Sequence, residues 1–218
     1  GLGDVYKRQI NALRSHLGEF GIIAPAGRHH IADLINLLSD VSDDDIPALA
    51  REALRSVIAA LQSLEERIKA IEAVIMREHK ANPASRRLAT IPGIGPITAS
   101  AIAATIADPS AFKSGRELAA WIGLVPRQHS SGGKQRLGRV SKQGDRYLRR
   151  LLTVGATAVI RRLPGKTDGH SAWIRALLDR RPFRLASLAL ANKMARIAWA
   201  VMLRQEAYRA PTMTTTAA

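Results

Sequence analysis

Cysteine is absent from this sequence, so neither a disulfide nor a thiolate metal site can stabilise the fold. Aromatic residues make up only 4% of the chain, while alanine and leucine are common, which favours helices packed through small and aliphatic side chains. No apolar stretch approaches ~20 residues without a charge, so we expect no membrane span. A chain of this kind is expected in the reducing cytoplasm.

Acidic residues are scarce in the second part of the chain. Residues 1–80 hold 10 Lys and Arg against 12 Asp and Glu, whereas residues 81–218 hold 23 against 6, so the net charge of +15 comes from the second part. This asymmetry indicates one part for structure or pairing and another that binds a polyanion, which predicts a nucleic acid as partner. The six acids are scattered, without the close carboxylate pairs of two-metal phosphoryl transfer, so we expect no metal site.

Residues 46–82 are expected to form one long helix. Eight apolar residues in this segment alternate between steps of four and three, which is a heptad seam: Ala50, Leu54, Val57, Leu61, Leu64, Ile68, Ile71 and Ile75. Two alternatives stay open, a helix of an intramolecular bundle and an intermolecular coiled coil that makes the protein a homo-oligomer.

Residues 83–208 are expected to form a helical domain that begins with a helix-hairpin-helix. The turn IPGIG contains Gly93 and Gly95 and leads into a helix that begins at Pro96. Glycines allow a tight turn, and free N–H groups at a helix start can face a phosphate of the nucleic-acid backbone. The alternative is a plain Gly-Pro turn between two packed helices.

A basic loop follows, RQHSSGGKQRLGRVSKQGDRYLRR, at residues 127–150 with the single acid Asp145. Its candidate phosphate-binding residues are cations and two loop glycines whose N–H groups can bind anions: Arg127, Gly132, Gly133, Lys134, Arg136, Arg139, Lys142, Arg146, Arg149 and Arg150. Ser130 and Ser131 lie among them. A serine hydroxyl is a poor nucleophile without a base or a strong local field, so these residues alone favour a phosphate-gripping loop over a catalytic serine.

The remaining segments also predict helices, and the fold class is therefore all-α. We expect a helix from about Gly115 to Ile122 with Trp121 in the core, another over residues 143–163, and a helical pair after residue 169. Residues 10–45 are expected to form linker helices, and residues 209–218 a disordered tail.

The sequence resembles a known family in the runs LATIPGIGPITASAIAATIADPSAFKSGRELAAWIGLVPRQHSSGGK, SKQGDRYLR and ALANKMARIAW. These are similar to the C-terminal part of bacterial insertion-sequence transposases of the DEDD type (IS116/IS110/IS902), relatives of the Piv DNA invertase. The resemblance implies an N-terminal RuvC-like domain whose four acids bind Mg²⁺, then a coiled coil, then a transposase domain with an essential serine. It implies DNA partners, namely the element ends and the target, and in some members a structured guide RNA.

Carried over to this sequence, the family serine falls on Ser131, with Ser130 as the fallback. Its implied role is attack on a DNA phosphate, with Arg127, Lys134 and Arg146 neutralising that phosphate. The RuvC-like domain has no counterpart here, and residues 1–9 look like a foreign or disordered leader. We therefore expect a fragment that holds no cofactor itself, binds nucleic acid and does not transpose alone. The alternatives are a non-enzymatic helix-hairpin-helix module and, less favoured, an RNA-binding structural protein.

Overall fold

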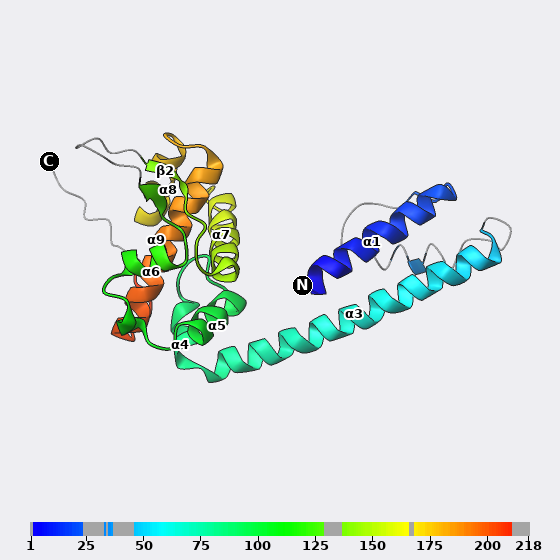
Figure 1. Cartoon of the computed structure of the whole chain (residues 1–218), viewed down its shortest axis with the longest axis horizontal. Coiled ribbons are helices and arrows are strands. Elements are labelled where there is room, and N and C mark those ends of the chain that lie inside the picture. Colours follow the sequence, from blue (N-terminus) through cyan, green and yellow to red (C-terminus); the bar gives the residue numbers. More distant parts are fainter. Residues whose placement is uncertain are drawn as a thin grey trace. The chain divides into compact units, whose positions relative to one another are not determined.

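The computed structural model describes residues 2–23, 33, 35–36, 46–128, 137–165 and 168–210. The chain divides into an N-terminal unit of residues 1–74 and a C-terminal unit of residues 75–218. The helices are α1 (Leu2–Glu19), α3 (Ala48–Ala81), α4 (Pro83–Leu88), α5 (Pro96–Thr105), η2 (Pro109–Ala111), α6 (Gly115–Trp121), α7 (Arg146–Arg161), α8 (Gly169–Leu178) and α9 (Phe183–Arg204). Strands β1 (Pro126–Gln128) and β2 (Leu137–Val140) pair with each other (Figure 1). The prediction of an all-α fold is confirmed.

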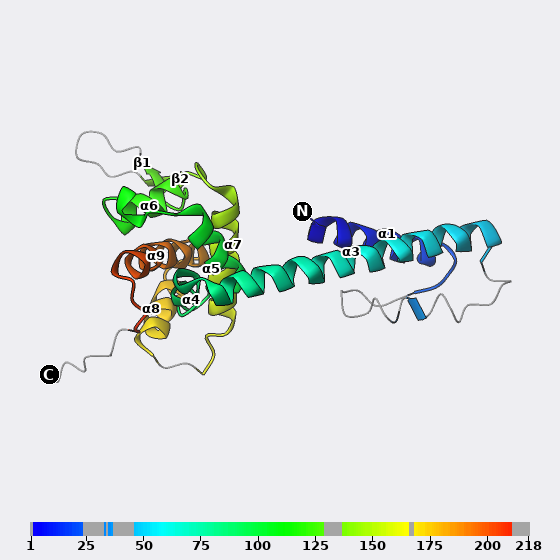
Figure 2. The same cartoon turned by 90° about the horizontal axis from the view of Figure 1, so that it is seen from below.

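The core of the N-terminal unit lies between α1 and α3, which run side by side (Figure 2). On α1 the buried residues step by four, three and four, which keeps them on one face of the helix: Tyr6, Ile10, Leu13 and Leu17. They pack with Leu54, Ile58 and Leu61 of α3. The Tyr6 hydroxyl also donates a hydrogen bond to Glu65 Oε2, 3.3 Å away.

The heptad seam of α3 divides into two parts. From Ala50 to Ile68 its residues are buried or half-buried in the cluster with α1, so this part of the seam serves an intramolecular core. Further along the helix, Ile71 of the seam is 47% exposed and Ile75 is half-buried, while Val74 and Met76, which lie beside the seam, are 45% and 40% exposed. An intermolecular coiled coil along this second part stays a prediction.

The first residues of the chain differ from our expectation of a disordered leader. Residues 2–9 form the first turns of α1, and Tyr6 within them is only 3% exposed. Within the segment 10–45, where linker helices were expected, most residues after 23 lie outside the described residues, as does the tail after residue 210.

The C-terminal unit is built around α9, which packs against α4, α6, α7 and α8 (Figure 2). Many of its buried residues are small, so neighbouring helices can approach its backbone closely: Ala186, Ser187, Ala191, Ala195 and Ala198. Gly115 at the start of α6 shows the effect, because a Cβ there would lie 3.0 Å from Arg196 Cα. The ends of the expected helices in this unit agree with the structure to within a few residues.

Side-chain caps fix where several of these helices begin. Asn82, Asp145 and Asp168 each accept a hydrogen bond from a backbone N–H three residues later, at 3.0, 2.8 and 2.9 Å. Such caps satisfy N–H groups that the helix itself leaves unpaired. Ser114 caps α6 in the same way, and Glu117 accepts from the N–H of Lys113 at 2.6 Å, which resembles a capping box.

Trp121 is not in the core, so that prediction was wrong. It lies at the C-terminal end of α6 and is 43% exposed, with its ring edge-on to Phe112 at a centroid distance of 5.7 Å. The helix instead turns Leu118, Ala119 and Ile122 inward. The hydrophobicity of Trp121 alone did not reveal which face of this short helix is buried.

A chain of polar contacts connects the last turn of α3 to α4 and α5. His79 Nδ1 lies 2.7 Å from Ser85 Oγ, which lies 3.2 Å from Ser100 Oγ. Ser85 is fully buried, so these contacts satisfy a hydroxyl that would otherwise be costly to bury.

The turn between α4 and α5 also packs directly on α7 through two glycines. Gly93 has a positive φ of 88°, and a Cβ built on Gly155 of α7 would lie 2.0 Å from the carbonyl oxygen of Gly93. An alanine at position 155 would therefore push the turn between α4 and α5 away from α7.

We expect Gly155→Ala to lower the free energy of unfolding by roughly 1–3 kcal/mol, because the methyl group overpacks this contact. Urea denaturation followed by circular dichroism measures the change. The matched control is Gly18→Ala on α1, where a Cβ meets nothing within 4 Å. This control should stabilise its helix by up to about 1 kcal/mol. Equal changes in the free energy of unfolding for Gly155→Ala and Gly18→Ala would contradict a close contact between Gly155 and Gly93.

Candidate nucleic-acid interface

A β-hairpin presents the segment that carries the predicted serines. β1 and β2 are antiparallel, with Pro126 opposite Val140 and Gln128 opposite Leu137, and an irregularity between the two pairs. Several predicted site residues lie in the connection, outside the described residues. Their roles stay predictions, and they are Ser130, Ser131, Gly132, Gly133, Lys134 and Arg136.

The base of this hairpin is fixed by a crossing of two backbone segments. Gly123 and Gly144 have φ angles of 80° and 87°, which favour glycine. A Cβ on Gly123 would lie 1.8 Å from Gln143 O, and one on Gly144 would lie 1.7 Å from Trp121 O. The N–H groups of Ser141 and Lys142 donate to Val125 O and Gly123 O, at 2.9 and 3.3 Å. Alanine at either glycine would separate the two segments.

Arg149 of α7 holds the same crossing together. Its Nη1 donates hydrogen bonds to the carbonyl oxygens of Ile122 and Gln143, at 2.7 and 3.2 Å. The sequence predicted a phosphate contact for this residue, and the structure gives it a structural role that the sequence did not reveal.

Asp145, the single acid of the segment from 127 to 150, is used by the fold. Its Oδ1 accepts the Leu148 N–H at 2.8 Å as the N-cap of α7. The carboxylate therefore lies at the positive end of the helix dipole. The neighbouring cations lie on β1, β2 and the first turns of α7.

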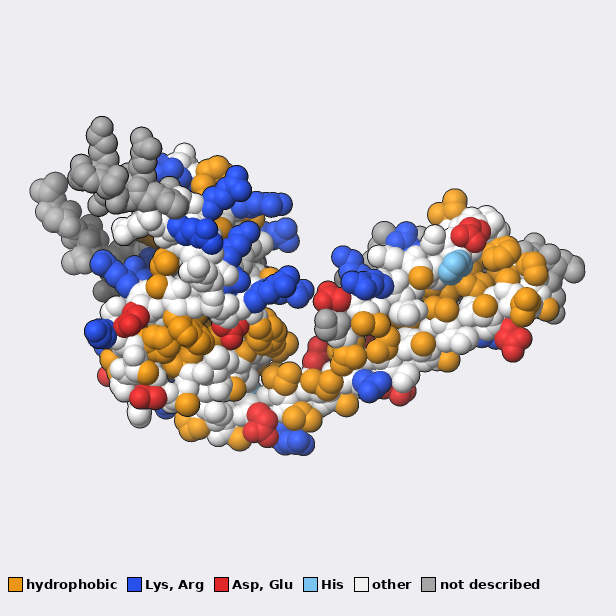
Figure 3. Space-filling model, viewed as in Figure 1, with side chains coloured by type: hydrophobic (Ala, Val, Ile, Leu, Met, Phe, Trp, Pro, Cys, Tyr) orange, Lys and Arg blue, Asp and Glu red, His pale blue; other side chains and the backbone are white. Residues whose placement is uncertain are grey.

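The predicted cations within the described residues are distributed around the hairpin base. Arg127, Arg139, Lys142, Arg146 and Arg150 are all exposed, on β1, β2, the loop after β2 and α7. Figure 3 shows Lys and Arg side chains gathered on the part of the C-terminal unit that bears α7, with few acids among them. The connection with Ser131 starts and ends within this group.

The two glycines of the turn between α4 and α5 have different surroundings. Gly93 is half-buried, and a Cβ on it would lie 2.8 Å from Val159 Cγ2 of α7. Gly95 is exposed, caps α5 without a side-chain hydrogen bond, and has nothing within 4 Å of a built Cβ. Of the two, only Gly95 offers open space beside the first N–H groups of α5. Phosphate binding by either residue stays a prediction.

The acids of the described residues do not assemble into a metal site: nowhere in these ranges do three or more His, Asp or Glu side chains come together as ligands. In the same ranges, no helix is both long and apolar enough to cross a lipid bilayer.

A groove between α6, α8 and α9 also contains cations, and the sequence did not reveal it as a site. It is lined by Arg116, Trp173, Lys193, Arg196 and Trp199 among others. The signal was present in ALANKMARIAW, because Lys193 and Arg196 are three residues apart and so share one face of the helix.

Comparison with known proteins identifies the segment that contains the β-hairpin and the exposed cations around its base. The sequence model of the transposase IS116/IS110/IS902 family matches residues 85–171, from the buried serine of α4 to the start of α8. The chain therefore carries a transposase domain of this family.

Related transposases extend the similarity to most of the chain. A probable family 20 transposase of Pseudomonas aeruginosa is 48% identical over 200 residues, which cover 91% of this chain and 59% of that protein. The transposase for insertion sequence element IS1111A of Coxiella burnetii is 38% identical over 92% of this chain and 55% of its own length. A pilin gene-inverting protein of Moraxella lacunata is 40% identical over 73 residues, or 33% of this chain and 23% of that protein. This chain thus spans little more than half the length of the two transposases.

We expect Arg149→Ala to lower the free energy of unfolding of the transposase domain by roughly 1.5–3 kcal/mol, because hydrogen bonds from a charged group are lost. Chemical denaturation measures this value. Arg146→Ala is the matched control, since Arg146 is exposed at the first residue of the same helix and should change stability by less than about 0.5 kcal/mol. If Arg149→Ala left the free energy of unfolding unchanged, the two backbone segments would not depend on the guanidinium for their contact.

Proposed function

We propose that this chain is the DNA-binding C-terminal part of a transposase that mobilises an insertion sequence, with Ser131 as its nucleophile and Ser130 as the alternative. One observation carries the proposal. Exposed Arg127, Arg139 and Arg146 surround the base of the hairpin whose connection contains Ser131, inside the segment that matches the transposase family. Cations around a hydroxyl are what a reaction at a DNA phosphate requires.

The proposed step is a transesterification. Ser131 Oγ forms a bond to a DNA phosphorus atom while one backbone P–O bond breaks, which leaves a phosphoserine link. The serine gives up its proton, and the released strand end gains one as a hydroxyl, so the step needs no other reactant. Arg127 and Arg146, together with Lys134, stabilise the charge that develops on the phosphate oxygens.

The Mg²⁺ ions expected for this family have no place in the described residues, because their acids do not fit a metal site. Acids of a RuvC-like domain outside this chain would bind the metal, and we assign no step to it here. Because the family resemblance implies that strand exchange needs a metal-binding RuvC-like domain, we expect this chain alone to bind DNA without exchanging strands.

A non-enzymatic helix-hairpin-helix module is the second candidate. The exposure of Gly95 and the uncapped start of α5 favour it, since these groups can contact a phosphate without any chemistry. In that case both serines would be dispensable.

We expect Ser131→Ala to lower strand exchange by more than about a thousandfold and to leave DNA affinity unchanged, because only the attacking oxygen is lost. The protein for this test joins the present chain to the N-terminal part of its Pseudomonas relative, and recombinant molecules are counted on DNA with cognate element ends.

The control for the serine test is Arg146→Ala in the same protein. It should weaken DNA binding about 3- to 10-fold and lower the slope of log affinity against log salt concentration by about 1, as expected for one lost phosphate contact. Unchanged exchange in both Ser131→Ala and Ser130→Ala would support the non-enzymatic module instead.

The proposed partners are the element ends and target DNA, a structured RNA, and a second copy of the chain. For the last, the exposed apolar residues of α3 suggest a coiled coil. Ile71→Lys with Val74→Lys should therefore shift the mass in sedimentation equilibrium to a smaller assembly. Glu72→Lys, an exposed neighbour, is the control. Equal masses for all three proteins would exclude this helix as the contact.

A further inference from the structure

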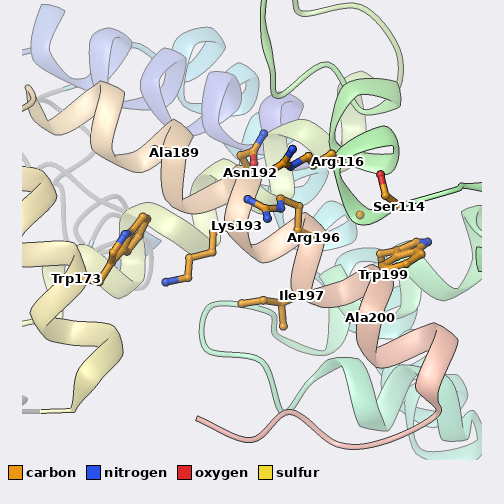
Figure 4. A pocket seen from close by; sticks show the side chains of 11 residues that line it. Ser114, Arg116, Trp173, Ala189, Asn192, Lys193, Arg196, Ile197, Trp199 and Ala200 are labelled. Atoms are coloured by element: carbon orange, nitrogen blue, oxygen red, sulfur yellow. The ribbon is translucent and has the colours of Figure 1, made fainter. Parts of the chain in front are cut away.

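The groove between the start of α6, α8 and α9 is open, with a volume of about 740 Å³. Figure 4 shows its side chains: Trp173 lies at one end, Trp199 at the other, and Lys193 and Arg196 between them, with Arg116 nearby. These residues come from three helices that meet only in the folded unit.

The groove holds cations without a counterion. Arg116, Lys193 and Arg196 line it, and no acid is among its lining residues. Neither guanidinium has a hydrogen-bond or ion-pair partner within the described residues. Burial of the Lys193 ammonium, together with the nearby charge of Arg196, lowers the pKa of Lys193. Like charges held this close favour the binding of an anion.

Apart from Ser114 and Asn192, the rest of the groove lining is aromatic or apolar. The Lys193 ammonium lies 3.8 Å from the centre of the Trp173 ring, a cation–π contact. Trp199 is fixed by a hydrogen bond from its Nε1 to Pro109 O at 3.0 Å. A ligand that fits this surface combines negative charge with a flat apolar group.

The groove adjoins the base of the hairpin. Asn192 lines it, and its Nδ2 donates to Leu124 O at 3.2 Å, two residues before β1 begins. A nucleic-acid strand in the groove can therefore continue toward the exposed cations around β1.

We propose that this groove binds an unpaired segment of nucleic acid, with its phosphates on Arg116 and Arg196 and a base stacked on Trp173. The base takes the place of the Lys193 ammonium over the indole, which frees Lys193 for a phosphate. A duplex cannot bind in this way, because its bases are already stacked on one another, whereas aromatic platforms beside cations are typical of single-strand binding. The proposal goes beyond the transposase function: it requires nucleic-acid binding and no serine chemistry.

The test compares single-stranded oligo(dT) with a duplex of equal length, using fluorescence anisotropy on the full 218-residue chain. Trp173→Leu should weaken binding of the single strand about tenfold and duplex binding less than twofold, because stacking is lost while charge is kept. Oligo(dT) should quench the tryptophan fluorescence of the parent chain, and this quench should be smaller in Trp173→Leu. Trp173→Phe should restore most of the affinity.

The charge variants are Arg116→Gln and Arg196→Gln. Each should lower the slope of log affinity for the single strand against log salt concentration by about 0.7, as expected for one lost phosphate contact. Arg184→Gln is the matched control, because Arg184 is exposed on α9 and does not line the groove. Circular dichroism shows that each variant is folded.

Three results would overturn the inference: no binding of oligo(dT) by the parent chain, groove variants that bind it within twofold of the parent, or equal losses for single strand and duplex. The second result would leave an acidic protein segment as the occupant of the groove. None of them affects the serine proposal, which depends on strand exchange by Ser131→Ala.

Discussion

The arrangement of the candidate site depends on a close passage of two backbone segments at the base of the hairpin. With a side chain at Gly123 or Gly144, a Cβ would fall within 2 Å of a carbonyl oxygen of the other segment. Because neither residue has one, the segment after α6 and the segment before α7 lie in direct contact, and Arg149 binds a carbonyl of each. This contact determines where β1 leaves the core and where α7 begins, and hence where the exposed cations lie.

The same principle recurs around α9. Gly115 lets α6 approach the backbone of Arg196, and Gly155 lets α7 touch the hairpin turn at Gly93. With few aromatic residues, the unit gains rigidity from close main-chain contacts between its elements rather than from large interlocking side chains. Its two half-buried tryptophans of α8 and α9 are then left to line a groove on the surface.

The sequence predicted the helices of the C-terminal unit well, because helix starts depend on local residues: in the structure Asn82 and Asp145 cap α4 and α7, and Pro83 is the first residue of α4. It could not predict roles that depend on distant partners. In the sequence, Arg149 could not be distinguished from its neighbours Arg146 and Arg150. Only the structure shows that it binds the carbonyl oxygen of Ile122. The sequence likewise did not reveal that Gly93 packs against α7. The burial of Tyr6 was missed for another reason. The buried residues from Tyr6 to Leu17 follow helical spacing, but residues 1–9 had been interpreted as a leader.

The pairing of Gln128 with Leu137 has a consequence for how such a protein can change over evolution. The ends of the connection are fixed by main-chain contacts that tolerate many side chains, so folding of the core places little demand on the connecting sequence. Doubling the length of such a connection costs only about 0.6 kcal/mol in closure entropy. Apart from the serine that the proposed reaction uses, related elements can therefore change this segment, by substitution or insertion, without first having to rebuild the helices that support it.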